Sequence, residues 1–252
     1  MRALALALLL SVAAPPSAQA SPLPPADVAA AVAAPGRSAD NVKMDESRKP
    51  AEILKWAGLR QGMAVLDLFG GNRYWAEIFA PAVGPKGHVT VWEADQFFGP
   101  KDRAAFETFA AANPNVTLLD SAMETPKLPV NAFDFAMFNL NYHDLYWESA
   151  DYKISRMDPA AWLKTLHAAM KPGSTVVVID HVANPGDTRD NVEKFHRIDP
   201  ATIQADFKRA GFELAGSSDI LRNPADDHSL KVFDPKVRGH TDRVVYKFRT
   251  VP

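Results

Sequence analysis

Two short stretches of the chain carry residue types that suit a nucleoside. Residues 65–71 form an apolar run that ends in the pair Gly70-Gly71, and residues 88–93 form a second apolar run that ends in Glu93. Glycines after a buried strand let the backbone approach a ligand closely. An acid about 20 residues later can accept hydrogen bonds from both hydroxyls of a ribose. The pair predicts a ligand that contains a nucleoside, without indicating which one.

A second polar set follows the apolar run 133–139, where His143 stands next to Asp144. Such a pair can act as a general base, because the pKa of imidazole lies near neutral pH; the alternative is a loop histidine with a structural hydrogen bond. His181 and His196 could face the same edge of a sheet. A metal site is conceivable there, but no His-x₃-His spacing supports one, so we expect no metal.

Strands and helices must alternate along the chain to bring these residues together. The apolar pattern and the Gly and Pro positions predict strands over 63–69, 88–93, 116–119, 133–139, 175–180, 212–220 and 243–248, and helices over 73–83, 100–112, 159–170 and 200–210. This alternation predicts an α/β fold with a doubly wound, seven-stranded, mostly parallel sheet. No helix separates the last two strands, so we expect them to form an antiparallel pair at one edge.

The first twenty residues read as a secretory signal. Arg2 precedes an apolar run that is too short to cross a bilayer, and Ala18-Gln19-Ala20 has the form of a cleavage site. We therefore expect a signal peptide over 1–20, a flexible leader over 21–38 that is rich in Ala and Pro, and one domain over 39–252. The resulting location is outside the cytoplasm, in the periplasm.

Composition narrows the possible partners and cofactors. The formal net charge is −2 with no basic run, so nucleic acid is not an expected partner. No later apolar run reaches about 18 residues, so we expect no membrane span. Cysteine is absent, which excludes disulfides, thiolate metal sites and cysteine nucleophiles. A small molecule remains the expected substrate, and the oligomeric state cannot be read from the sequence.

At this point the chain resembles the class I S-adenosylmethionine-dependent methyltransferases, and within them a group of exported bacterial predicted methyltransferases. The resemblance covers about residues 37–248. It rests on the motifs Asp45-x-x-Arg48-x-Pro50, Gly62-Met63-x-Val65-x-Asp67, Gly70-Gly71, Asn141-x-His143-Asp144, His196-Arg197-Ile198-Asp199, Leu221-Arg222-Asn223-Pro224, Phe233-Asp234-Pro235 and Arg238-Gly239.

The resemblance implies roles for the residues that end the strands. Asp67 would lie near the methionine amino group, the two glycines would admit the cofactor, and Glu93 would hold the ribose hydroxyls. Asp120 or Ser121 would lie near the adenine edge. The residues that would border the methyl group or act as the base, and hence the expected catalytic set, are Asn139, Asn141, His143 and Asp144.

The chain departs from the family in the loop that follows the first strand. The broad family pattern is Asp-x-Gly-x-Gly-x-Gly, and its three glycine positions here hold Phe69, Gly71 and Arg73. Arg73 places a large cation where small residues usually admit the methionine end. Its side chain could turn outward, could pair with the ligand carboxylate, or could fill the pocket and prevent cofactor binding.

Three functions follow from these observations. The first is methyl transfer from S-adenosylmethionine to an unidentified small molecule by direct displacement, with His143 as the base. The second is an exported binding or scaffold protein that keeps the fold without catalysis. The third is a nicotinamide oxidoreductase, because an acid after the second strand also suits that ribose. The missing Gly-x-Gly-x-x-Gly and the expected antiparallel pair argue against the third.

Overall fold

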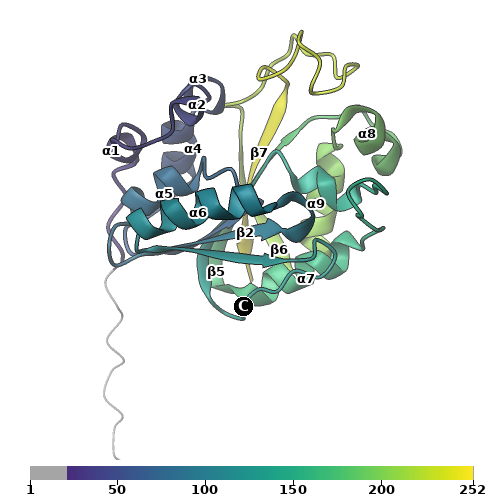
Figure 1. The fold of residues 1–252 in the computed structure, drawn as a ribbon. Helices are drawn as coiled ribbons and strands as arrows, with labels where there is room; N and C mark the ends of the chain where they lie inside the picture. The colour runs from purple at the N-terminus through teal and green to yellow at the C-terminus, as the bar shows by residue number, and fades with distance from the viewer. Residues whose placement is uncertain (1–21, 252) are drawn as a thin grey trace, which may run out of the picture.

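A computed structural model describes residues 22–251 of the chain, and its centre is one seven-stranded sheet (Figure 1). The strands are β1 (Ala64–Leu68), β2 (His88–Ala94), β3 (Val116–Ser121), β4 (Phe133–Asn139), β5 (Met170–His181), β6 (Phe212–Ser218) and β7 (Arg243–Thr250). Their order is β3-β2-β1-β4-β5-β7-β6, with β7 antiparallel to both neighbours. The prediction of a doubly wound sheet with a terminal antiparallel pair is confirmed. Because the strand order reverses between β1 and β4, a crevice is expected there.

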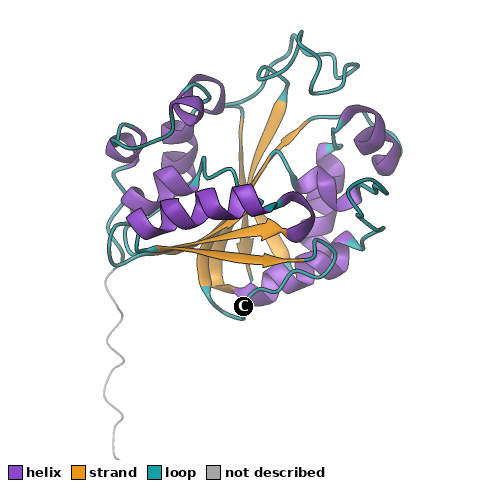
Figure 2. Ribbon diagram, in the orientation of Figure 1, coloured by secondary structure: helices purple, strands orange, loops and turns teal. Residues whose placement is uncertain are grey.

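Helices cover both faces of the sheet (Figure 2). They are α1 (Val28–Val32), α2 (Ala39–Val42), α3 (Asp45–Arg48), α4 (Pro50–Ala57), α5 (Ala76–Val83), α6 (Pro100–Ala112), α7 (Pro159–Ala169), α8 (Thr188–Phe195) and α9 (Pro200–Arg209), with 3₁₀ turns η1 (Asp95–Phe97) and η2 (Tyr142–Tyr146). Helices α4, α5 and α6 pack in one hydrophobic cluster, and α7 and α9 pack in another on the opposite face.

The two clusters follow from the alternation of side chains along each strand. In β5, Val176 and Val178 belong to the cluster of α7 and α9, while Val177 and Ile179 belong to the cluster of α4, α5 and α6. All four are buried. A strand with apolar residues on both faces can only be central, which explains why its continuous β-branched run was readable from the sequence.

Two element boundaries differ clearly from the predictions, and one helix was not predicted. Helix α5 begins at Ala76 instead of residue 73, because Arg73 adopts a left-handed conformation with a φ of 66°. Strand β5 begins at Met170, directly after α7, where Met170 pairs with Phe133. Helix α8 was not predicted at all. Its only buried residue is Val192, so it shows no apolar stripe in the sequence.

The N-terminal part of the described chain packs on the domain. The expected signal peptide, 1–20, lies outside the described residues. Within the expected leader, helix α1 contacts α4 and α5, and its Val28 and Ala31 are buried. No helix between residues 22 and 251 has the length and apolar character needed to cross a membrane.

Candidate active site at the carboxyl edge of the sheet

A cleft of about 280 Å³ lies where β1, β2 and β4 end. Seven of the residues that line it were predicted from the sequence as site residues: Asp67, Phe69, Gly70, Glu93, Asn139, Asn141 and Asp144. Its other lining residues were not: Arg48, Leu68, Asn72, Trp75, Phe97 and Leu140. The strand ends are therefore brought together as expected, and the N-terminal segment adds a cation to them.

The glycine pair is required by two acidic side chains that fill the space beside it. A Cβ on Gly70 would lie 2.4 Å from Oδ2 of Asp67, and a Cβ on Gly71 would lie 2.6 Å from Oε2 of Glu93. The amide of Gly71 donates a hydrogen bond of 2.8 Å to the same Oε2, and the amide of Ala94 donates one of 2.9 Å to Oε1. The loop thus holds the Glu93 carboxylate in a fixed orientation.

Asp67 and Glu93, two of the three acids that line the cleft, keep protons more tightly than usual. Burial and the nearby Glu93 charge raise the pKa of Asp67 to about 8, although the Arg48 cation acts in the opposite direction. Burial also raises the pKa of Glu93 to about 7, against the two backbone hydrogen bonds that it accepts. At neutral pH the Asp67 carboxyl is therefore mostly protonated, whereas Glu93 is close to its own pKa.

Unpaired polar atoms gather around this cleft. Seven buried side-chain nitrogen or oxygen atoms have no hydrogen-bond partner among residues 22–251, and four of them belong to residues that line the cleft. These four are Arg48 Nη1, Asp67 Oδ2, Trp75 Nε1 and Asn141 Oδ1. Buried polar atoms without partners are rare and costly in proteins. Their concentration at one place indicates that the cleft binds a polar ligand.

Arg48 reaches the cleft from helix α3 through a network of its own. Its guanidinium lies 4.1 Å from the centre of the Tyr74 ring. The Tyr74 hydroxyl donates to Asp45 at 2.8 Å, and Arg37 donates to the same carboxylate at 2.6 Å. Burial lowers the pKa of Arg48. The signal for this residue was present in the motif Asp45-x-x-Arg48-x-Pro50, which marked the family and not the site.

Arg73 is not among the residues that line the cleft. Its backbone amide donates to Gly70 O at 2.8 Å, which closes the loop. Asp120 and Ser121 do not line the cleft either: Asp120 pairs with Arg103 at 2.7 Å, and the Ser121 hydroxyl accepts a hydrogen bond from Trp92. The structure thus brings Glu93 and Asp67 to the cleft and leaves the expected adenine-side pair outside it.

A second cavity of about 500 Å³ adjoins the cleft and shares Phe97, Leu140 and Asp144 with it. The rest of its wall combines histidines with apolar and aromatic side chains: His143, Trp147, Tyr152, His181, His196, Val232 and Phe233. The two cavities together offer adjacent places for two molecules, with Asp144 between them.

His143 is held between two carboxylates. Its Nδ1 lies 2.7 Å from Oδ1 of Asp180, and its Nε2 lies 3.4 Å from Oδ1 of Asp144. Burial disfavours the charged imidazole, but the two acids outweigh it and raise the pKa of His143 to about 9. Burial raises the pKa of Asp144 to about 6. At neutral pH the His143 imidazole is therefore protonated on both nitrogens and positively charged, and Asp144 is mostly ionised. The group of the pair that can accept a proton is the carboxylate. Asp180, which controls this state, was not predicted as a site residue.

A larger hollow of about 900 Å³ lies at the opposite edge of the sheet, near the start of β2. Much of its wall is Pro, Ala and Gly, and Asn115 there donates to Ala80 O and Gly84 O. Its wall also includes Arg37, Glu77 and His88, but only one of the seven buried polar atoms without a partner among the described residues, Arg37 Nε, belongs to it, against four in the cleft. We therefore assign the site to the carboxyl edge.

No family model matches the sequence. Demethylmenaquinone methyltransferase from Listeria welshimeri is 28% identical over 130 residues, which are 51% of this chain and 49% of that protein. The chain thus spans about half the length of the curated relatives it matches. An S-adenosylmethionine-dependent methyltransferase from Aquifex aeolicus superposes with a TM-score of 0.57 at 19% identity, covering 85% of this chain and all of the other.

A third match is the 1,6-didemethyltoxoflavin-N1-methyltransferase of Burkholderia thailandensis, solved with 1,6-didemethyltoxoflavin and S-adenosylhomocysteine. Its TM-score is 0.53 at 15% identity, over 84% of this chain and 80% of the other. The chain has the Rossmann-like methyltransferase fold. In this methyltransferase fold, the cleft with Glu93 lies at the reversal of strand order between β1 and β4.

Proposed function

We propose that the chain transfers the methyl group of S-adenosylmethionine to a small-molecule acceptor. The observation that carries this proposal is the set of four unpaired polar atoms around one cleft, beside Glu93 and a glycine pair that leaves no room for side chains. The fold and the partial relationship to a methyltransferase support the same reaction class.

The polar groups of the cleft fit the parts of this cofactor. Glu93 would accept hydrogen bonds from the ribose hydroxyls, as its position at the end of β2 suggests. The Asp67 carboxyl, with Oδ2 unpaired, would take the amino group, and the Arg48 guanidinium would take the carboxylate. A cationic ligand would also favour ionisation of Asp67 and Glu93, whose pKa values are raised by burial.

The protein is required to do little chemistry of its own. S-adenosylmethionine supplies a methyl carbon that is already activated by a sulfonium. The protein can therefore achieve much of the remaining rate acceleration by aligning the two reactants and excluding water. Asp144 lines both cavities and is placed to accept a proton from an acceptor in the second one. His143 lies between Asp144 and Asp180, and the positive charge of its protonated ring would stabilise the Asp144 carboxylate.

The competing proposal of a non-catalytic exported protein was motivated by Arg73 in the cofactor loop and by export to a place where S-adenosylmethionine is expected to be scarce. Arg73 lies outside the wall of the cleft, which supports methyl transfer over the first of these two reasons. Export itself stays a proposal that rests on residues 1–20.

Calorimetric titration of the mature protein with S-adenosylhomocysteine tests the function. We expect micromolar binding to the wild type and to Glu107→Ala, which changes an exposed acid of α6. In Glu93→Ala the affinity should fall roughly tenfold to hundredfold, because hydrogen bonds to a charged group are lost. Absence of binding at millimolar ligand, or equal binding in both variants, would overturn the proposal.

A further inference from the structure

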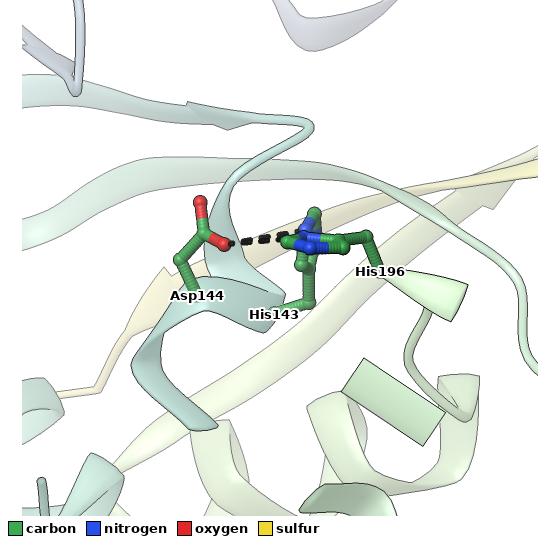
Figure 3. A group of neighbouring side chains, drawn as sticks. All are labelled: His143, Asp144 and His196. Carbon is green, nitrogen blue, oxygen red and sulfur yellow. Dashed lines mark ion pairs between the residues drawn. The ribbon is translucent and has the colours of Figure 1, made fainter. Parts of the chain in front are cut away.

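Three potential metal ligands converge on the wall of the second cavity (Figure 3). His143 and Asp144 come from η2, and His196 comes from the C-terminal end of α8. One nitrogen of each histidine and one oxygen of Asp144 lie within 4.8 Å of one another. We infer that His143, Asp144 and His196 bind a divalent cation of the zinc class, on the acceptor side of the cleft.

The distances suit a tetrahedral ion with little rearrangement. Oδ1 of Asp144 lies 3.4 Å from Nε2 of His143 and 3.9 Å from Nδ1 of His196. Two ligand atoms that are each about 2.05 Å from a tetrahedral centre are about 3.3 Å apart. The two separations from Asp144 therefore exceed this value by about 0.1 and 0.6 Å, and the two nitrogens lie no more than 4.8 Å apart, so small side-chain rotations would close the set around Zn²⁺. Two imidazoles and one carboxylate form a donor set typical of catalytic zinc.

The surrounding residues orient both histidines for this task. Asp180 occupies Nδ1 of His143, which leaves Nε2 directed at Asp144, the arrangement that carboxylates impose on metal-bound histidines. The His196 ring forms no hydrogen bond to another residue within residues 22–251. His196 follows the last residue of α8 and adopts a left-handed conformation with a φ of 51°, where the chain leaves the helix. His181 is not part of the set, because its Nδ1 is bonded to Thr241 at 2.7 Å.

The local charge favours a cation. Asp144 and Asp180 flank one imidazole in a largely buried place, and the side chains of His143 and His196 are only 4% and 11% exposed. A divalent ion bound by Nε2 of His143 and by Asp144 would balance the negative charge of the two carboxylates, which interact strongly with a cation at low dielectric.

A fourth coordination position remains for a ligand from the cavity. Asp144 is 19% exposed, and the wall beyond it is aromatic, with Trp147 and Phe233 against the His196 ring. This suits a planar acceptor that carries a hydroxyl. Its oxygen would bind the ion, and its proton would pass to Oδ2 of Asp144, the carboxylate oxygen outside the ligand set. The acceptor role rests on the proposed function, whereas metal binding does not.

Titration of the full, chelator-treated chain with Zn²⁺ tests the site, with Mg²⁺ as the hard-cation comparison. We expect one Zn²⁺ per chain at micromolar affinity or better, and far weaker Mg²⁺ binding. Asp144→Asn and His196→Asn should each weaken Zn²⁺ binding by more than roughly 100-fold. His88→Asn is the matched control, because His88 lies at the opposite edge of the sheet beside Thr117, and it should bind as the wild type does.

Two results would overturn the inference: no stoichiometric Zn²⁺ binding to the wild type, or equal affinity in His196→Asn. The titration with S-adenosylhomocysteine is run on metal-free wild type in chelator. If the wild type binds Zn²⁺ but not S-adenosylhomocysteine, the methyl-transfer proposal alone is refuted. If it binds S-adenosylhomocysteine but not Zn²⁺, the metal site alone is refuted.

Discussion

The acidic residues of the cleft have pKa values well above their ordinary range. Asp67 is almost completely buried, has one unpaired oxygen and has a pKa raised to about 8. A folded protein gains no stability from such a group, and its persistence is understandable if a cationic ligand meets it. The consequence is a defined dependence of stability on pH.

We expect Asp67→Asn to become more stable than the wild type as the pH rises. The folded pKa of about 8 lies above the ordinary value of 3.8, so between these values the native state binds a proton that the unfolded chain releases. The contribution of Asp67 to the free energy of unfolding therefore falls as pH rises through this window, by at most about 1.4 kcal/mol per pH unit, and then levels off. Urea denaturation at pH 5, 7 and 9 measures the difference; parallel pH curves for the two proteins would contradict it.

The residues that sequence alone could locate are those placed by a single strand and its end. Gly70, Glu93 and Asn139 each end or follow a readable apolar run, so parallel pairing alone brings them together. Arg48 and Trp75 could not be placed in the same way. Their positions depend on how separate helices pack, which no local periodicity encodes.

At the scale of elements, the short helices before β1 form one side of the cleft. Lys49 takes a left-handed conformation between α3 and α4, with Pro50 as the first residue of α4. The Arg243 side chain of β7 donates to Ser47 O at 2.7 Å and fixes this segment to the sheet. The guanidinium of Arg48 is thereby delivered to a cleft otherwise made from strand ends.

We predict that Arg48→Met weakens binding of S-adenosylhomocysteine but leaves 5′-methylthioadenosine almost unaffected. The second ligand has the same nucleoside without the amino-acid carboxylate, so it lacks the group that Arg48 would pair with. The loss for the first ligand should be roughly tenfold or more. Calorimetry with both ligands measures the ratio. Glu93→Ala is the matched comparison and should weaken both, whereas an equal loss of both ligands in Arg48→Met would contradict the assignment.

The strands were readable because burial dictates their composition, whereas α8 was not. The run 175–180 forms the centre of β5, and α9 begins at Pro200 as predicted. Helix α8 has one buried residue, Val192, and therefore shows no apolar periodicity in the sequence. The unpredicted helix matters for the site, because His196 follows its last residue. His196 comes close to Asp144 only through tertiary packing, which the sequence pattern does not encode.

For the whole molecule, the arrangement of layers leaves one edge available for function. Two hydrophobic clusters occupy the faces of the sheet, so ligands can enter only at its ends. The loop from β6 to β7 and helix α8 stand at the same end (Figure 1), where the buried pair of Arg197 and Asp226 fastens the loop at 2.8 Å. The carboxyl edge is therefore enclosed by late segments of the chain, and the wide hollow near β2 lies at the opposite edge.

Hydrogen exchange with and without S-adenosylhomocysteine should distinguish these two edges. A ligand at one hundred times its dissociation constant stabilises the bound state by about 2.7 kcal/mol, so amides that exchange by opening the site should slow by up to about 100-fold. We expect protection in residues 44–49, 70–73 and 93–95, because the N-terminal segment and both strand ends contact one cleft, and none in residues 113–115 at the hollow. Glu93→Ala at the same ligand concentration should lose most of this protection. Protection confined to residues 84–88 and 113–115 would instead place the ligand at the opposite edge and refute the assignment of the cleft.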